Sequence, residues 1–331
     1  MMNSRFKRWF GALLVPIALA AGVQWVQPAN AQDYPSRPIN LVVPFAPGGV
    51  NDSVARIISD PLGAELKQSI VVLNKGGVGG AIGTAEVAKG GPTGYNLLLA
   101  NGGITIHPDA ERISGRQPMY ELSQVEPIAL LSSDPMMILV RADSPYKTLA
   151  DLIKAARDKP ETVSYSSSGN FGPIFLSVEL LAQAANVKFL HVPYKGGGPA
   201  VIGLLSGDVA MTTAGPNVAA PQIAAGKVRA LAVSGTKRLA AFPEVPTYRE
   251  AGFDAEYYIW TGIYGPSGMP PAVIQKLRGA IRDVARSERV ATAMSRQGIM
   301  ADYRDSADFK TYVEQDAARI IALLKKIGKI D

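Results

Sequence analysis

The residues that could do chemistry gather in four segments of glycine and small polar side chains, each placed after a predicted strand. In open α/β sheets, ligands bind outside the carboxyl ends of the strands. Glycine lets the backbone approach a ligand, and the N-terminus of a following helix adds partial positive charge. This combination suits a small carboxylate. The alternative for any one loop is an ordinary turn, but the recurrence favours an anion site. The segments are residues 46–52, 101–103, 166–170 and 194–198.

The common catalytic and cofactor motifs are absent from the sequence. A G-x-G-x-x-G match that starts at Gly77 fails because Ile82 stands at the last position, and neither a P-loop nor a G-x-S-x-G elbow occurs. The absence of cysteine excludes disulfides, cysteine-ligated metal sites and a thiol nucleophile. His107 and His191 have no paired carboxylate at a recognisable spacing. We therefore expect no catalysis, no cofactor and no metal site.

Several side chains near these segments allow two interpretations. His191 lies in an apolar run and is expected to be a core histidine rather than a base or ligand. Asp52 is either the N-cap of the following helix or a residue that faces a ligand. Lys195 is either solvated or turned to the cleft. Tyr257, Tyr258 and Trp260 could wall a cleft, although core packing is the favoured interpretation.

The elements that must position these segments alternate between strands and helices. This alternation predicts an α/β fold with largely parallel sheets. Residues 104–124 are polar and irregular by comparison, and the chain is expected to cross between two halves near 128–140 and 228–245. Thr148 and Asp151 form a capping pair for a helix. Strands are expected at 39–45, 70–73, 97–100, 136–140, 163–165, 189–192, 209–212 and 228–233, and helices after Asn51 or Asp52, at 81–89, 173–185, 198–205 and 217–225, from 270 and from 305.

The chain of 331 residues is long enough for about two domains, and 47% hydrophobic residues exclude a disordered chain. Its first 31 residues read as a secretory signal, with a basic start, an apolar stretch and a small-x-small site that predicts cleavage after Ala31. The alternative, a membrane anchor, would need a longer apolar run. Without the signal, 31 Lys and Arg face 28 Asp and Glu, a net charge of +3. This balance gives no reason to expect a nucleic-acid partner.

Short motifs covering 34–330 resemble the Bug/TctC-like receptors, the extracytoplasmic solute-binding proteins of tripartite tricarboxylate transporters. Each motif alone is weak, but their order and spacing are specific. They are Phe45-Ala46-Pro47-Gly48-Gly49 with Asp52 and Ala55-Arg56, Asn74-Lys75 before Gly79-Gly80-x-Ile82-Gly83, Pro92-x-Gly94-Tyr95-x-Leu97, Tyr165-x-Ser167-x-Gly169, Val192-Pro193-Tyr194-Lys195-Gly196, Gly226 to Val233, and Val245-Pro246-Thr247-x-x-Glu250-x-Gly252.

The resemblance implies a two-lobed periplasmic-binding-protein fold of the type II, Venus flytrap kind, with crossing hinge strands. Lobe 1 would comprise 32–132 plus 241–331, and lobe 2 would comprise 133–240. The protein would capture a small carboxylated ligand in the periplasm, as a monomer, and deliver it to the membrane permease subunits. Matching motif positions imply a binding site of Phe45, Gly48, Gly49, Asp52, Asn101, Gly102, Gly103, Ser167, Gly169, Asn170, Tyr194, Lys195 and Gly196.

The sequence departs from the family pattern after Gly169, where Asn170 and Phe171 replace the usual small residues. A bulky Phe171 in the cleft suggests, as a hypothesis, an aromatic or smaller acid as ligand. Two other functions stay open. One is an exported α/β hydrolase-like enzyme, which the missing nucleophile motif disfavours. The other is an orphan receptor that feeds a signalling partner.

Overall fold

The computed structural model describes residues 34–327, and the described residues from Pro35 form one compact unit. The predicted signal peptide at 1–31 and its cleavage site lie outside the described residues. Within the described part, no helix combines the length and the apolar character needed to cross a membrane.

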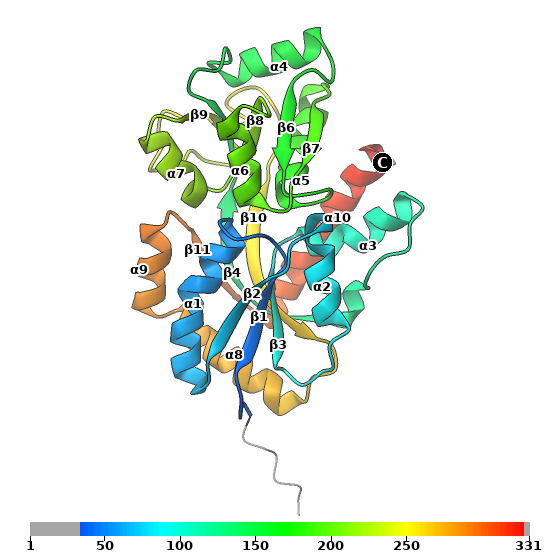
Figure 1. Cartoon of the computed structure of the whole chain (residues 1–331), viewed down its shortest axis with the longest axis vertical. Helices are drawn as coiled ribbons and strands as arrows, with labels where there is room; N and C mark the ends of the chain where they lie inside the picture. The colour runs from blue at the N-terminus through cyan, green and yellow to red at the C-terminus, as the bar shows by residue number, and fades with distance from the viewer. Residues whose placement is uncertain (1–33, 328–331) are drawn as a thin grey trace, which may run out of the picture. The chain divides into compact units, whose positions relative to one another are not determined.

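The first of two sheets has six strands in the order β11-β4-β10-β3-β1-β2 (Figure 1). We call this sheet and its helices lobe 1. Strands β2 and β3 pair in parallel with β1, whereas β10 and β11 join through antiparallel pairings. Its strands are β1 (Ile39–Val43), β2 (Ile70–Asn74), β3 (Asn96–Ala100), β4 (Val125–Pro135), β10 (Tyr258–Pro266) and β11 (Ala301–Asp305).

Two groups of helices pack against this sheet, and Figure 1 shows them on its opposite sides. One group is α1 (Val50–Leu66), α8 (Pro271–Ala285) and α9 (Glu288–Arg296), and the other is α2 (Ala81–Ala88), α3 (Gly103–Ile113) and α10 (Ser306–Ile327). Short 3₁₀ turns lie at Val78–Gly80 and Leu122–Gln124. The core beneath α2 and α10 includes Trp260 and Phe309, whose rings pack edge to face with their centroids 5.5 Å apart. Burial of these apolar faces fixes the helices on the sheet.

The second sheet has five strands in the order β7-β6-β8-β5-β9, and with its helices it forms lobe 2. A separate apolar core, which includes Met137, Leu204 and Val233, lies between this sheet and its helices. The elements are β5 (Met137–Arg141), α4 (Leu149–Asp158), β6 (Ser164–Ser167), α5 (Pro173–Ala185), β7 (Leu190–Pro193), α6 (Gly197–Ser206), β8 (Met211–Ala214), α7 (Pro216–Ala224) and β9 (Val228–Val233).

The chain changes sheets twice, at Met136 between β4 and β5 and again between β9 and β10. Both places fall in or next to the regions where crossing was expected. The exact lobe boundaries stay a prediction. The expectation of largely parallel sheets is wrong, because the crossing strands run against their neighbours: β4 and β10 pair antiparallel, as do β5 and β8. A strand that returns from one lobe to the other enters the sheet in the opposite direction.

Local sequence signals explain several helix ends. The Thr148 hydroxyl accepts a hydrogen bond from the Asp151 N–H in a capping box, as predicted. Capping of α1 by Asn51 or Asp52 is wrong, because Gly49 is the N-cap and makes no side-chain cap bond. The expectation of irregular structure at 104–124 is also wrong for its first half, where α3 runs despite Pro108.

Candidate ligand-binding site

A cavity of about 40 Å³ lies between the two lobes, and residues of both lobes line it. The loops that reach it follow the carboxyl ends of β1, β3, β6, β7 and β8, the edge at which α/β sheets bind ligands. The floor comes from the crossing segments through Met136 and Ile259. The lining is Phe45, Ala46, Gly49, Val50, Asn51, Asp52, Asn101, Met136, Ser168, Pro173, Ile174, Gly197, Thr213, Ala214, Gly215, Val218 and Ile259.

Four helices of eight residues or more begin at this cavity. Lining residues include the N-cap Gly49 of α1, Pro173 at the start of α5, Gly197 at the start of α6, and the N-cap Gly215 of α7. The first-turn N–H groups of a helix have no partner within the helix, and the helix dipole places partial positive charge there. None of the described lining residues is a lysine, arginine or histidine. The arrangement therefore favours an anion through backbone groups.

Three buried polar side chains in the lining have an atom without a partner among the described residues. These atoms are Asn51 Nδ2, Ser168 Oγ and Thr213 Oγ1, and each residue is at most 3% exposed. Asn51 belongs to lobe 1, and Ser168 and Thr213 belong to lobe 2. An unpaired buried polar group costs free energy that a bound ligand can recover. Together with the helix N-termini, these atoms point to a ligand held by both lobes.

A short hydrogen-bond relay fixes the orientation of the Asn51 amide. The Gly103 N–H donates to Asn101 Oδ1 at 3.1 Å, so the Nδ2 group of Asn101 is left to donate. It donates to Asn51 Oδ1 at 2.9 Å. Because its oxygen is occupied, Asn51 presents Nδ2, a donor, to the cavity. Asn101 is thus a positioning residue for Asn51.

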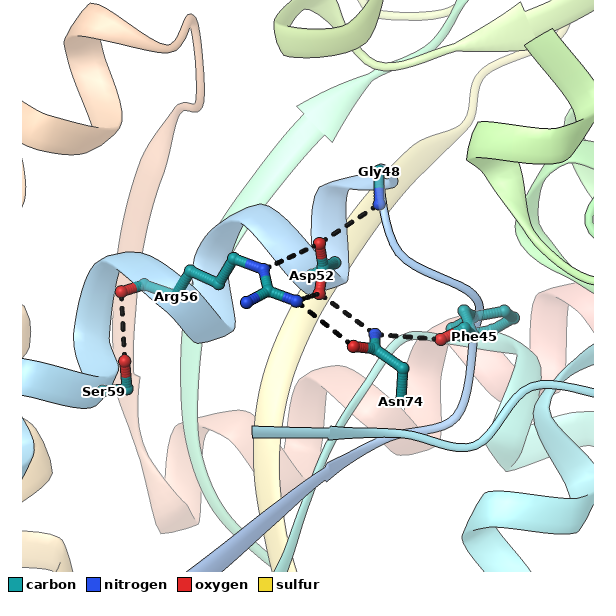
Figure 2. A network of polar contacts seen from close by, with 6 residues as sticks. All are labelled: Phe45, Gly48, Asp52, Arg56, Ser59 and Asn74. Carbon is teal, nitrogen blue, oxygen red and sulfur yellow. Dashed lines mark hydrogen bonds and ion pairs between the residues drawn. The ribbon is translucent and has the colours of Figure 1, made fainter. Parts of the chain in front are cut away.

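Figure 2 shows that Asp52, the one charged residue in the described lining, is held by Arg56, Gly48 and Asn74. Its carboxylate accepts hydrogen bonds from the Gly48 N–H at 3.1 Å and from Asn74 Nδ2 at 3.0 Å, and it pairs with Arg56 at 3.0 Å. Burial raises the pKa of Asp52, but the hydrogen bonds from Arg56, Gly48 and Asn74 outweigh burial and hold the pKa below its usual range. Asn74 Nδ2 also donates to the Phe45 carbonyl. The network fixes the loop that carries Gly49.

The two lobes touch through their main chains beside the cavity. The Ala46 N–H donates to the Lys195 carbonyl at 3.2 Å. A Cβ atom on Gly198 would lie 2.5 Å from the Pro47 oxygen, and one on Gly79 would lie 2.1 Å from the Asn170 oxygen. Glycine at these positions therefore permits the lobes to approach as closely as they do.

The structure places the predicted site residues in three ways. Phe45, Gly49, Asp52 and Asn101 line the cavity. Others act beside it: Gly48 and Gly103 donate to Asp52 and Asn101, and Gly196, Gly169 and Asn170 lie where the lobes meet. The Gly102 carbonyl accepts from the Thr105 hydroxyl.

The side chains of Tyr194 and Lys195 lie outside the lining. The Tyr194 hydroxyl lies against Gly203 of α6, and Lys195 is exposed and meets lobe 1 through its carbonyl. Ser167 is buried and also outside the lining. Its hydroxyl accepts from the Gly169 N–H and lies 2.5 Å from His191 Nε2. Burial lowers the pKa of His191 to about 4.

The aromatic side chains that could have walled the cavity pack elsewhere. Phe171 is buried against His107 and Phe175 and is not part of the lining, so the hypothesis based on it has no support here. Tyr257 and Trp260 are at most 2% exposed and belong to the core, as favoured, whereas Ile259 between them faces the cavity.

Sequence reasoning missed the fifth loop, around Thr213, Gly215 and Val218, and it did not single out Asn51 and Ser168 within the predicted segments 46–52 and 166–170. A signal was present, because Thr212-Thr213-Ala214-Gly215 ends a predicted strand and Pro216 starts a helix. Among the described residues, no group of three or more acidic or histidine side chains could hold a metal ion.

Two α/β lobes joined by crossing strands, with a ligand cavity between them, define a two-lobed binding protein. Comparison with known proteins identifies the family. A family model described as the tripartite tricarboxylate transporter family receptor matches residues 54–329, and the chain belongs to this family.

Known relatives cover nearly the whole chain. The UPF0065 protein in the tcbD-tcbE intergenic region of a Pseudomonas species is 37% identical over 291 residues, which span 87% of this chain and 85% of the relative. The structure of the periplasmic binding protein BugD has a TM-score of 0.83 at 33% identity and covers 90% of this chain and 100% of its own. MatC from Rhodopseudomonas palustris, solved with bound malate, has a TM-score of 0.82 at 28% identity and covers 88% of this chain and 100% of its own. The predicted family and fold class are therefore confirmed.

Proposed function

We propose that this protein is a periplasmic receptor that captures a small organic carboxylate between its lobes and delivers it to the permease subunits of a tripartite tricarboxylate transporter. It would be exported by cleavage after Ala31 and act as a monomer. One observation carries the proposal: four helix N-termini and three buried polar side chains that each have an atom without a partner surround one cavity, and its described lining contains no cationic side chain. The malate bound to MatC supports a carboxylate as the ligand.

The donors around the cavity suffice for useful affinity. A micromolar dissociation constant corresponds to about −8 kcal/mol. Each hydrogen bond to a charged group contributes roughly 1.5–3 kcal/mol. Five or six such bonds from Asn51, Ser168, Thr213 and first-turn N–H groups reach that value after the cost of ordering the ligand. A ligand that touches both lobes also stabilises the arrangement in which they meet.

A hydrolase function has less support. Ser167 and His191 form a serine–histidine pair, but Ser167 is fully buried and lies outside the cavity. The lowered pKa of His191, about 4, makes it a weak base at neutral pH. The pair instead holds the loop of Gly169 in place. We therefore propose binding without chemical conversion.

A thermal-shift screen of organic acids, followed by calorimetry, tests the proposal. An acid at about 100 times its dissociation constant should stabilise the protein by about 2.7 kcal/mol. Asn51→Asp removes a donor and adds a negative charge to the cavity, so it should abolish binding. Asn186→Asp makes the same change at an exposed helix end and serves as the control. Failure of every acid to stabilise the wild-type protein, or turnover of a bound acid, would refute the proposal. The orphan-receptor alternative would instead be favoured if no permease genes neighboured the gene of this protein and the protein bound a signalling protein.

A further inference from the structure

The side chains around the cavity are mostly apolar, and this bears on which acid it takes. Large apolar side chains from both lobes and from the crossing segments wall it: Phe45, Val50, Met136, Pro173, Ile174, Val218 and Ile259. The polar exceptions include three side-chain atoms without a hydrogen-bond partner, those of Asn51, Ser168 and Thr213. One carboxylate has two oxygens, and these donors with the helix N–H groups can satisfy it.

We infer that the cavity binds a short aliphatic monocarboxylate, with propionate and butyrate as the fitting size, in preference to a di- or tricarboxylate. The inference rests on the proposed function and adds the class of ligand. The carboxylate accepts hydrogen bonds from the polar atoms, and the hydrocarbon chain contacts the apolar walls. The relative MatC, which was solved with malate, then differs from this chain in ligand class.

The charges around the cavity oppose a second carboxylate. The described lining holds no lysine, arginine or histidine, so a second carboxylate would find no counter-charge there. It would instead meet Met136, Val218 and Ile259, and a buried charge without a partner is strongly unfavourable. Asp52 supplies no counter-charge either, because its own carboxylate is held in the ionised form by Arg56 and Asn74.

The size of the cavity sets the length of the hydrocarbon chain. A cavity of about 40 Å³ is small, because a single water molecule already needs about 10–15 Å³ of such space, so only a short chain beyond the carboxylate can be held. A carboxylate with a short chain fills this space, while a longer chain would press against buried wall residues such as Ile174 and Met136, both at most 3% exposed, or extend out of the cavity. Close-packed walls resist such displacement. Affinity should therefore rise with chain length and then fall.

Calorimetry with the wild-type mature protein and a series of acids tests the inference. From acetate to propionate to butyrate, the affinity should rise about fourfold per methylene, and from butyrate to octanoate it should fall. Malate and succinate should bind at least tenfold more weakly than butyrate. Malate or succinate binding as tightly as butyrate would overturn the inference and leave the proposed function standing. If no acid of either kind binds, both fail.

A gain-of-function variant gives a second, independent measurement. Val218 is half-buried on α7 and lines the cavity, so Val218→Arg adds a cation at the apolar wall from a position that keeps contact with solvent. We expect the affinity for malate to increase at least tenfold relative to the affinity for butyrate. Val71→Arg adds the same charge on the exposed side of β2, away from the cavity, and should change neither affinity. A malate-to-butyrate ratio that is unchanged in a folded Val218→Arg protein would contradict the inference.

Discussion

Replacing Gly198 by alanine should separate ligand binding from folding. Gly198 is a first-turn residue of α6, and it meets Pro47 and Gly48 of the other lobe. The alanine Cβ would lie 2.5 Å from the Pro47 oxygen, whereas ordinary contacts begin at about 3.4 Å. The lobes must therefore move apart by about 0.9 Å, which strains the contact from Ala46 to Lys195 nearby.

The magnitude follows from the cost of overpacking. Forcing one extra methyl group into a packed contact costs about 1–3 kcal/mol. Because about 1.4 kcal/mol is a factor of ten in affinity, Gly198→Ala should weaken acid binding by roughly ten- to hundredfold. Its effect on folding should be opposite in sign, since alanine is up to about 1 kcal/mol better than glycine within a helix.

Two assays check this prediction. Calorimetry gives the affinity for the tightest acid of the screen, and thermal unfolding without ligand gives the stability. The sequence has no cysteine, so Lys154→Cys on α4 and Lys276→Cys on α8 allow two spin labels at exposed positions, one on each lobe. The distance between the labels should shorten on binding in wild type and less in the variant. Gly279→Ala in α8, with nothing within 4 Å, is the control. Wild-type affinity in Gly198→Ala would refute the view that the lobes must meet this closely.

Three further changes have definite expected outcomes. Burial raises the pKa of Asp134 from 3.8 to about 7, so the free energy of unfolding should fall as pH rises between these values, by up to roughly 1.4 kcal/mol per pH unit. In urea titrations at several pH values, Asp134→Asn should lose this dependence of stability on pH. An unchanged dependence would contradict the assignment. Burial lowers the pKa of His107 from 6.5 to about 4, so the free energy of unfolding should decrease as pH falls from 6.5 to 4. His107→Gln should lose part of this acid sensitivity, and the rest should come from His191. A plot of unfolding free energy against pH that matches wild type would count against this prediction. Asp52→Ala frees the Gly48 N–H and loosens the cavity loop, so calorimetry should show weaker acid binding while thermal unfolding stays cooperative; undiminished affinity would mean that this loop does not serve the site.

The sequence predicts the bounds of several elements well. Helix α5 at Pro173–Ala185 and strand β9 at Val228–Val233 have the expected bounds, because proline and apolar runs mark their ends. The α3 helix was missed because Pro108 and neighbouring glycines argue locally against a helix, while packing against α10 stabilises it. The antiparallel β10 could not be placed, since its partners β3 and β4 are distant in sequence.

The candidate site was predictable as a set of loops, but not as individual side chains. The glycine-rich loops after β1, β3, β6 and β7 do reach the cavity. Which residue of each loop faces it depends on the backbone angles, so Gly197 lines the cavity while Tyr194 turns to α6. Glycine was expected to expose N–H groups to a ligand. At Gly79 and Gly198 its missing side chain instead allows contact between the lobes.

Peptide groups make some of the contacts between the lobes, beside side-chain contacts such as the one between Asn217 and Ser53. The contacts of Ala46, Pro47 and Gly79 with the opposite lobe involve main-chain atoms, which stay the same whatever side chains stand nearby. Substitutions at Val218 or Ile174 would change the lining of the cavity and leave these main-chain contacts unchanged. If the proposed function is right, a few mutations in the cavity wall would suffice to change the ligand while the main-chain contacts between the lobes are inherited unchanged.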